Sequence, residues 1–160
     1  MTEVQNPPAG TFFEDFAPGQ LFRHMRGKTV TDLDVMLLAQ MTMNTAQGHF
    51  NADAMKKEKF GQPIAYGGVT ASIVVGLASE DTAENAVAEL GMGKLRLRVP
   101  VVAGDTLYAV TETLSVEESD RPDAGIVAFR HVGVNQRKEF VCEIERRVLI
   151  RRRGAARSLA

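Results

Sequence analysis

Apolar and β-branched residues alternate with polar ones in five runs along the second half of the chain. Alternation places successive side chains on opposite faces of a sheet, and from Lys94 to Val99 it predicts a strand with one face in water. Short turn-forming segments separate the runs, among them 91–93 and 103–105, and such connections favour antiparallel pairing. The five predicted strands are residues 86–90, 94–99, 106–116, 125–133 and 139–151.

The first half of the chain changes to helical spacing after one predicted strand at 21–30. Thr31 followed by Asp34 is a capping pair, which predicts a helix that runs to about Met43. A second, short helix is expected at 51–59. These elements come before the longest apolar stretch of the chain.

From Gly67 to about Ser79 nearly every residue is small or apolar. Apolar residues on all sides predict a buried helix. The pattern alone does not exclude a strand, but the length and the small residues favour a helix that other elements wrap closely. One strand, helices and then more strands indicate an α+β fold, with an antiparallel sheet around a long central helix.

No repeat or linker divides the chain. Residues 1–11 are polar and proline-containing, so we expect a flexible N-terminal lead-in, followed by a single domain at 12–153 and a C-terminal tail at 154–160. A chain of 160 residues that is 44% hydrophobic can build one proper core, whereas two domains would each be small.

The formal net charge of −1 gives no reason to expect a nucleic-acid partner or binding to an anionic membrane. Cys142 is the only cysteine, which excludes an internal disulfide and a cysteine-based zinc site and fits a reducing compartment. No basic segment leads into an apolar run at the N-terminus, and no run of about eighteen residues is wholly apolar. We therefore expect a cytoplasmic protein outside the membrane.

The candidate chemistry gathers at 43–77. A turn-rich segment carries an amide, Asn44, and an imidazole, His49. A helix then opens with Gly67 and Gly68, and the free N–H groups of a helix start attract negative charge. This order predicts a reactive pair beside a site where negative charge can develop.

Four segments resemble, in order and spacing, the MaoC-type hydratases and dehydratases, single-hot-dog enzymes that act on acyl-coenzyme A thioesters. They are Phe-Glu-Asp-Phe-x-x-Gly-Gln at 13–20, the histidine segment that ends at Phe50, Phe-Gly-x-Pro-Ile at 60–64 and Pro-Val-x-x-Gly-Asp-Thr-Leu at 100–107. Residues 42–45, 74–77, 85–87 and 135–136 look most like the mesaconyl-CoA hydratase branch, also called β-methylmalyl-CoA dehydratase.

The resemblance implies a hot-dog fold and the reversible hydration of an enoyl-CoA thioester, with a short branched dicarboxylic acyl group such as that of mesaconyl-CoA. It also implies a homodimer whose site lies near the subunit interface. No cofactor is expected beyond the coenzyme A of the substrate. No metal is expected either, since three scattered histidines and one cysteine offer no ligand cluster.

In this family an aspartate, and a histidine five residues later, hold and deprotonate the attacking water. His49 matches the histidine, whereas Asn44 stands at the aspartate position and cannot act as a base. Gly67 matches the glycine whose N–H polarises the thioester carbonyl. Three further residues are expected to contact substrate: Tyr66 in place of the usual histidine, Gly68, and Val75 in place of a common serine.

The amide at Asn44 has a chemical interpretation. His49 alone can be the base, and Asn44 can still orient the water. If the substrate carries its own carboxylate, an aspartate would repel it and an amide would not. We hypothesise that Asn44 marks a carboxylated substrate, which Arg96, Arg98 or Arg130 can pair with; the sequence does not rank these arginines.

Structural roles for the same residues stay open at this stage. Asn44 can be a left-handed helix C-cap, Gly67 a close-packing glycine and Tyr66 a packing residue. His24 and His131 lie in strand-like runs and are interpreted as structural.

Two rival functions also stay open. A hot-dog thioesterase needs a carboxylate near the central helix, for which Glu80 and Asp81 are the candidates. A non-catalytic acyl-CoA-binding partner subunit would explain the missing aspartate.

Overall fold

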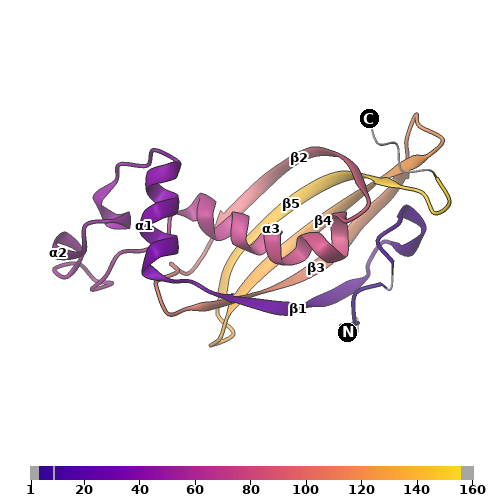
Figure 1. Ribbon diagram of the computed structural model, residues 1–160. Helices are drawn as coiled ribbons and strands as arrows, with labels where there is room; N and C mark the ends of the chain where they lie inside the picture. The colour runs from indigo at the N-terminus through magenta and orange to yellow at the C-terminus, as the bar shows by residue number, and fades with distance from the viewer. Residues whose placement is uncertain (1–3, 9, 156–160) are drawn as a thin grey trace.

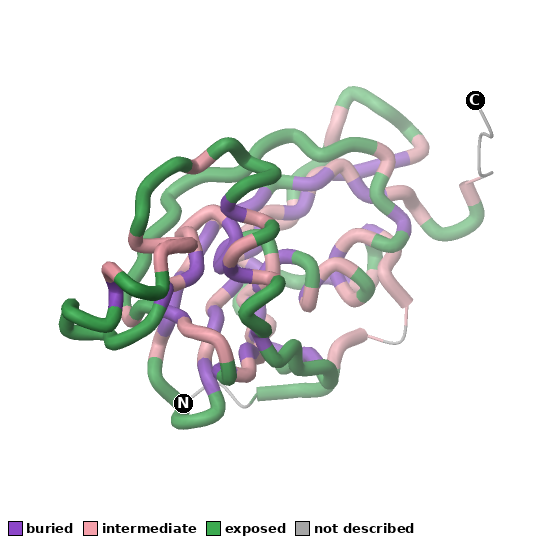
Figure 2. Tube along the Cα trace, turned by 60° about the vertical axis from the view of Figure 1, so that its left-hand side comes forward, coloured by how far each residue is buried: buried purple, intermediate pink, exposed green. Residues whose placement is uncertain are grey.

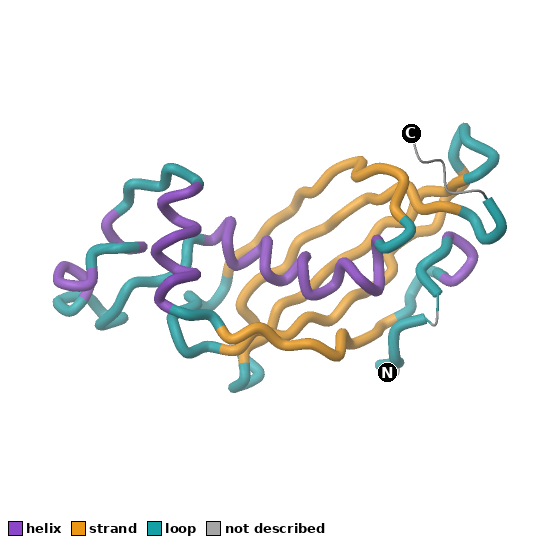
Figure 3. The backbone as a smooth tube through the Cα atoms, in the orientation of Figure 1, coloured by secondary structure: helices purple, strands orange, loops and turns teal. Residues whose placement is uncertain are grey.

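The computed structural model describes residues 4–8 and 10–155, which form an antiparallel sheet wrapped around one long helix (Figure 1). Helix α3 (Gly67–Ala83) lies across one face of the sheet (Figure 3). The strands stand in the spatial order β1-β3-β4-β5-β2, and every neighbouring pair is antiparallel. They are β1 (Leu21–Thr29), β2 (Ala86–Leu97), β3 (Thr106–Glu118), β4 (Ala124–Asn135) and β5 (Phe140–Arg151). The predicted α+β hot-dog fold is confirmed.

The shorter helical segments lie mostly beyond the N-terminal end of α3 (Figure 1). They are α1 (Asp32–Met41), η2 (Gln47–His49) and α2 (Ala52–Met55), while η1 (Phe13–Asp15) precedes β1. The predicted capping pair is confirmed: Thr31 Oγ1 accepts the Asp34 N–H at 3.1 Å, and the Asp34 carboxylate accepts the Thr31 N–H at 2.8 Å. The chain therefore places a group of short helices and loops around the start of α3.

Strand β2 differs from its prediction in two ways. The predicted turn at 91–93 lies inside one continuous strand, because register shifts on either side of it absorb the irregular residues while β2 stays paired with β5. The prediction of one wet face is also wrong, since β2 is an edge strand that is exposed almost throughout. Its exposed apolar side chains are Leu90, Met92, Leu95 and Leu97.

Two helices end elsewhere than predicted. Helix α2 stops at Met55, and the exposed residues 56–59 form turns, because they offer no apolar face that would stabilise further helix. Helix α3 continues to Ala83, since Asp81 is held by His24 and the buried Thr82 hydroxyl donates to the Ala78 carbonyl at 2.7 Å.

Helix α3 is also not buried on every side. Ser72, Gly76 and Glu80, spaced four residues apart, are exposed and form one stripe along the helix. The opposite side carries the fully buried Val74 and Ala78. The sheet therefore covers most of the helix surface and leaves this stripe in solvent.

Part of the predicted N-terminal lead-in lies beside β1. Gln5, inside the predicted lead-in, donates its N–H to the Leu21 carbonyl at 2.8 Å and accepts the Arg23 N–H at 3.2 Å. This part of the lead-in therefore pairs with the edge of β1. Of the predicted tail, residues 156–160 lie outside the described part of the chain.

A buried polar row separates two parts of the hydrophobic core. On β4, Phe129 belongs to one apolar cluster and the buried His131 follows it; on β3, Ala109 belongs to the other cluster and the buried Thr111 follows it. Buried positions are purple in Figure 2. The row runs from Asp81 on α3 to His24, then Thr111 and His131 on adjacent strands, with contacts of 2.6, 2.6 and 2.8 Å.

Burial lowers the pKa of both imidazoles and so favours their neutral forms. A carboxylate only accepts, so a neutral His24 donates from Nδ1 to Asp81 and accepts the Thr111 hydroxyl proton at Nε2. Thr111 Oγ1 then accepts from His131 Nδ1. Both rings are buried and held within the row, which confirms the structural interpretation of His24 and His131.

We expect stability to fall as the pH drops below about 6.5, the ordinary histidine pKa. Burial, aided by Arg146 and His24, lowers the pKa of His131 to about 3. Burial also lowers the pKa of His24, against the opposing effect of Asp81. Since the unfolded chain takes up these protons first, the His131 contribution is complete above pH 6.5 and is lost toward pH 3, at about 1.4 kcal/mol per pH unit.

Urea unfolding at pH 7.5, 6.5 and 5.5 measures this dependence. The interval lies above the range where carboxylates titrate, so the histidines dominate it. A His131→Gln variant should be less stable at pH 7.5 but show a shallower decline. An unfolding free energy that is equal at pH 7.5 and 5.5 in the parent protein would contradict the neutral row.

Candidate active site

A cavity of about 450 Å³ lies at the N-terminal end of α3. Its walls come from the loop after α1, from the segment that leads into α3 with the first turn of that helix, and from the end of β2 with the loop that follows. Five of the six predicted site residues line it: Asn44, His49, Tyr66, Gly67 and Gly68. Residues that are 24 positions apart in the sequence therefore share one pocket.

The position of His49 is set by the backbone of the segment before α3. His49 Nδ1 lies 2.8 Å from the Ile64 carbonyl oxygen, and the Ile64 N–H donates to the Gly48 carbonyl at 3.0 Å. Because a carbonyl oxygen only accepts, Nδ1 carries the proton, and the neutral ring keeps a free lone pair on Nε2. The ring centroid lies 5.7 Å from that of Tyr66. His49 thus presents a basic nitrogen while its other nitrogen is anchored.

Asn44 follows a left-handed helix end. Helix α1 closes with Met43 at φ 56°, the Met43 N–H donating to Gln40 O and the Asn44 N–H to Ala39 O at 2.9 Å each. The left-handed residue is Met43, so the alternative of Asn44 as a left-handed C-cap is wrong. Asn44 Oδ1 accepts the Ala46 N–H at 3.0 Å, which orients the side chain and leaves its NH₂ group to donate.

The start of α3 has two adjacent glycines because two large side chains close over it. A Cβ on Gly67 would lie 2.2 Å from Leu97 Cδ1, and a Cβ on Gly68 would lie 2.7 Å from Tyr66 Cε1. The first N–H groups of a helix have no acceptor inside it, and no side chain caps this end through Tyr66, the N-cap residue. The two glycines therefore let Leu97 and Tyr66 pack closely against a helix start that lines the pocket and has no side-chain cap.

Thr70 is a pocket residue that the sequence reasoning missed. It is 3% exposed, and its hydroxyl has no hydrogen-bond partner among the described residues. The other hydroxyls within α3, those of Ser72, Ser79 and Thr82, each donate to the carbonyl four residues earlier. A polar residue three positions after Gly67 lies on the same helix face, and this spacing is the signal that could have identified it.

Val75 and two arginines do not reach this pocket. Val75 packs with Ala71 and Ile144, and its predicted contact with substrate stays a prediction. Arg96 pairs with Glu143 at 3.1 Å, and Arg130 pairs with two carboxylates, at 2.9 and 3.3 Å.

Arg98 is the arginine that lines the pocket. Its guanidinium carbon lies 5.8 Å from the Phe140 ring centroid, and no ion pair to a described carboxylate engages it. Among the described residues of the lining it is the only Lys or Arg, and the lining contains no Asp or Glu from these ranges. The structure therefore ranks Arg98 first among the three candidates.

The rest of the described chain shows no metal site and no membrane-spanning helix. In the described part of the chain no three His, Cys, Asp or Glu side chains come together as metal ligands. Within the same residues, no helix has both the length and the apolar character to cross a bilayer. The described lining of the pocket offers an imidazole, an amide, a guanidinium, the hydroxyls of Tyr66 and Thr70, and a helix start.

Comparison with known proteins identifies what this chain is similar to. The family model described as mesaconyl-CoA hydratase matches residues 7–152. Mesaconyl-CoA hydratase of Haloarcula marismortui is 35% identical over 91% of this chain and 43% of its own length. Beta-methylmalyl-CoA dehydratase of Chloroflexus aurantiacus is 29% identical over 96% of this chain and 43% of its own length.

A solved structure of a single domain has the same fold as this chain. The MaoC-like dehydratase of Rhodospirillum rubrum superposes with a TM-score of 0.78 at 28% identity, covering 91% of this chain and all of that one. The chain spans less than half the length of the two curated relatives described above, so it corresponds to one part of each.

Proposed function

Since the chain belongs to the mesaconyl-CoA hydratase family, we propose that it hydrates an enoyl-CoA thioester reversibly in the pocket at the start of α3. The observation that supports the proposal is that His49, held through Nδ1 by the Ile64 carbonyl, and Gly67, the first residue of α3, line one cavity. The favoured substrate is a short, branched, dicarboxylic thioester such as mesaconyl-CoA, with β-methylmalyl-CoA as its hydrated form.

The proposed reaction assigns one task to each group. His49 Nε2 takes a proton from water as the oxygen bonds to the β-carbon, and electrons move through the double bond onto the thioester oxygen. The Gly67 N–H and the helix start stabilise that negative charge. Protonated His49 then returns a proton to the α-carbon, so the sum is addition of one water. No metal or further cofactor takes part in this scheme.

Asn44 and Thr70 orient the reactants in this proposal. Asn44 Oδ1 already accepts one N–H, and its second lone pair is available to the attacking water. Its NH₂ group is able to donate to a substrate carboxylate, where an aspartate would repel it. The free hydroxyl of Thr70 offers a further contact to the acyl group. Tyr66 and Gly68 shape the wall beside His49.

Arg98 is the proposed partner of the substrate carboxylate. A guanidinium pairs with a carboxylate through two parallel hydrogen bonds, which gives direction as well as charge. Arg98 has no ion-pair partner among the described carboxylates, so binding substrate would cost no existing ion pair. The coenzyme A phosphates are the other anions that it could contact, and a neutral acyl-CoA separates the two cases.

A homodimer in the cytoplasm belongs to the same proposal. The edge strand β2 leaves backbone groups and four large apolar side chains uncovered, and such an edge favours pairing with another strand. Leu95 and Leu97 on this edge also line the pocket. A partner on β2 would therefore cover the mouth of the site. The single, buried Cys142 is compatible with a reducing compartment.

The structure weakens the thioesterase alternative. Its two candidate carboxylates lie toward the far end of α3 from Gly67: Asp81 binds His24 at 2.6 Å and Glu80 pairs with Arg26 at 2.5 Å. Neither lines the pocket. A carboxylate positioned to attack a thioester carbonyl is thus missing from the described lining.

We expect the purified protein to hydrate mesaconyl-CoA, and a His49→Ala variant to lose about 10²- to 10⁴-fold in kcat because the base is removed. Loss of enoyl absorbance over a panel of mesaconyl-, itaconyl- and crotonyl-CoA measures the activity. Release of free thiol, followed in parallel, would instead support a thioesterase. Tight binding with no turnover of any of the three would support a non-catalytic partner subunit.

We expect Asn44→Asp to lower kcat/KM about tenfold for mesaconyl-CoA, because a second negative charge beside the substrate carboxylate costs about 1.4 kcal/mol. Crotonyl-CoA, whose acyl group is neutral, should be affected much less. Full activity of Asn44→Asp on the dicarboxylic thioesters would refute this explanation for the amide.

Arg98→Gln tests the proposed cationic partner, with Arg96→Gln, two residues earlier and inside β2, as its matched control. A loss confined to mesaconyl-CoA in Arg98→Gln assigns Arg98 to the acyl carboxylate. An equal loss on crotonyl-CoA assigns it to coenzyme A instead. Arg96→Gln should leave both activities unchanged.

A further inference from the structure

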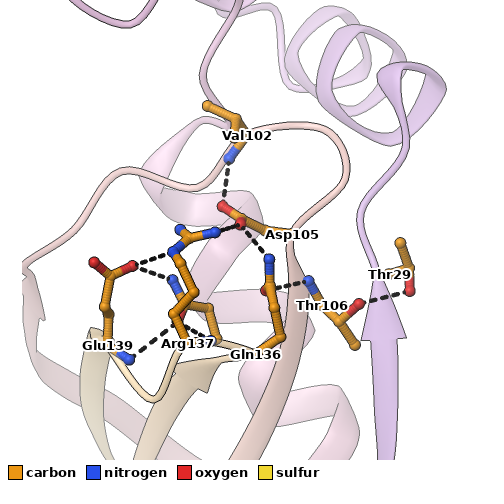
Figure 4. A network of polar contacts seen from close by, with 8 residues as sticks. Thr29, Val102, Asp105, Thr106, Gln136, Arg137 and Glu139 are labelled. Carbon is orange, nitrogen blue, oxygen red and sulfur yellow. Dashed lines mark hydrogen bonds and ion pairs between the residues drawn. The ribbon is translucent and has the colours of Figure 1, made fainter.

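Asp105 is a buried carboxylate in a loop where a tight turn alone would not need a charge. It follows Gly104, whose φ of 93° makes the turn, and it is 2% exposed. The carboxylate accepts the Val102 N–H at 3.2 Å, Gln136 Nε2 at 3.0 Å and an Arg137 guanidinium N–H at 2.8 Å (Figure 4). Three donors from two segments therefore converge on one side chain.

The same donors tie the loop to the turn between β4 and β5. Gln136 Oε1 accepts the Thr106 N–H at 2.9 Å, and Arg137 Nε donates to Glu139 at 2.7 Å (Figure 4). Burial alone would raise the pKa of Asp105, but the Val102 N–H, Gln136 and Arg137 outweigh it and hold that pKa below its usual range. Asp105 is thus ionised, and its charge is compensated by fixed partners.

A short series of backbone contacts connects this network to His49. Asp105 holds Val102, and Val102 forms an isolated antiparallel bridge with Ile64. The neighbouring Ala65 N–H donates to the Val101 carbonyl at 2.7 Å. The Ile64 carbonyl then accepts from His49 Nδ1 at 2.8 Å. The contacts in this series are hydrogen bonds and one isolated β-bridge, and they run from Asp105 to His49.

We propose that Asp105 is a positioning residue for His49. It fixes the segment 101–102, which fixes the Ile64 carbonyl that keeps the His49 proton on Nδ1 and the lone pair on Nε2. The catalytic part of this inference rests on the proposed hydratase function. The positioning part does not, since the tautomer is a property of the protein without substrate.

The test is ¹⁵N NMR of the three histidine rings, at a pH where His49 is neutral, in the parent protein and in Asp105→Asn. The His49 signals are assigned by their loss in His49→Gln. The parent should show the Nδ1–H tautomer, and Asp105→Asn should show a mixture with Nε2–H. His24 and His131, which belong to a different network, should keep their tautomers and report that the core is intact.

Kinetics on mesaconyl-CoA give the second readout. We expect kcat to fall about 10- to 100-fold in Asp105→Asn with a small change in KM, because an outer partner orients the base without touching substrate. The pH profile of kcat should change shape as well. Asp123→Asn is the matched control: it breaks an exposed pair with Arg121, whose bonds are 2.9 and 2.8 Å, at the turn between β3 and β4.

Each outcome decides the proposal. An unchanged His49 tautomer with unchanged kcat in Asp105→Asn overturns it, and so does an effect of equal size in Asp123→Asn. If Asp105→Asn does not fold, Arg137→Gln decides in its place, since it removes the cation from Asp105 and should shift the tautomer in the same direction. A shifted tautomer in a protein that hydrates none of the thioesters supports the positioning role and refutes the proposed function.

Discussion

The hydrogen bond from His49 Nδ1 to the Ile64 carbonyl is the interaction on which the account of the pocket depends. It joins a loop after α1 to the segment that starts α3, and so fixes the base relative to the helix start. Ile64 is held on both sides, by Gly48 and by the bridge to Val102. A free histidine would exchange its proton between two nitrogens, whereas a carbonyl acceptor selects one of them.

The pocket favours negative charge because the carboxylates near α3 lie outside its described lining. The carboxylates near α3 are engaged elsewhere, Asp81 by a buried histidine and Glu89 by Arg146 at 2.6 Å. What faces the cavity is the N-terminal end of a helix, an amide and Arg98. The described residues of the lining include donors and no carboxylate, which suits an anionic substrate and the negative charge that the proposed hydration would develop on the thioester oxygen.

Local patterns were sufficient for the strands, the capped α1 and the existence of the central helix. They failed where a residue far away in the sequence decides where a strand or helix ends. Strand β2 is continuous through Gly91 because β5 tolerates bulges opposite it, and α3 extends because His24 receives Asp81. The family pattern made His49 and Gly67 candidates, whereas the helical spacing that puts Thr70 on the same face as Gly67 was not used, and the pocket shows Thr70 in its lining.

The contribution of Asp105 could not be read from the sequence at all. A glycine followed by an aspartate predicts a turn, and the turn is present. Gln136 and Arg137 donate to the Asp105 carboxylate, but they lie about thirty positions further along the chain. Pairing between strands β3 and β4 brings them together, and such long-range pairing is not encoded in any local window.

A crystal structure with methylsuccinyl-CoA, the saturated and therefore unreactive analogue of mesaconyl-CoA, tests the central claim most directly. The account predicts the thioester oxygen about 3 Å from the Gly67 nitrogen. It also predicts that the carbon corresponding to the β-carbon faces His49 Nε2, with the free carboxylate toward Asn44 and Arg98. An acyl group bound outside this cavity, or a thioester oxygen turned away from the start of α3, would contradict it.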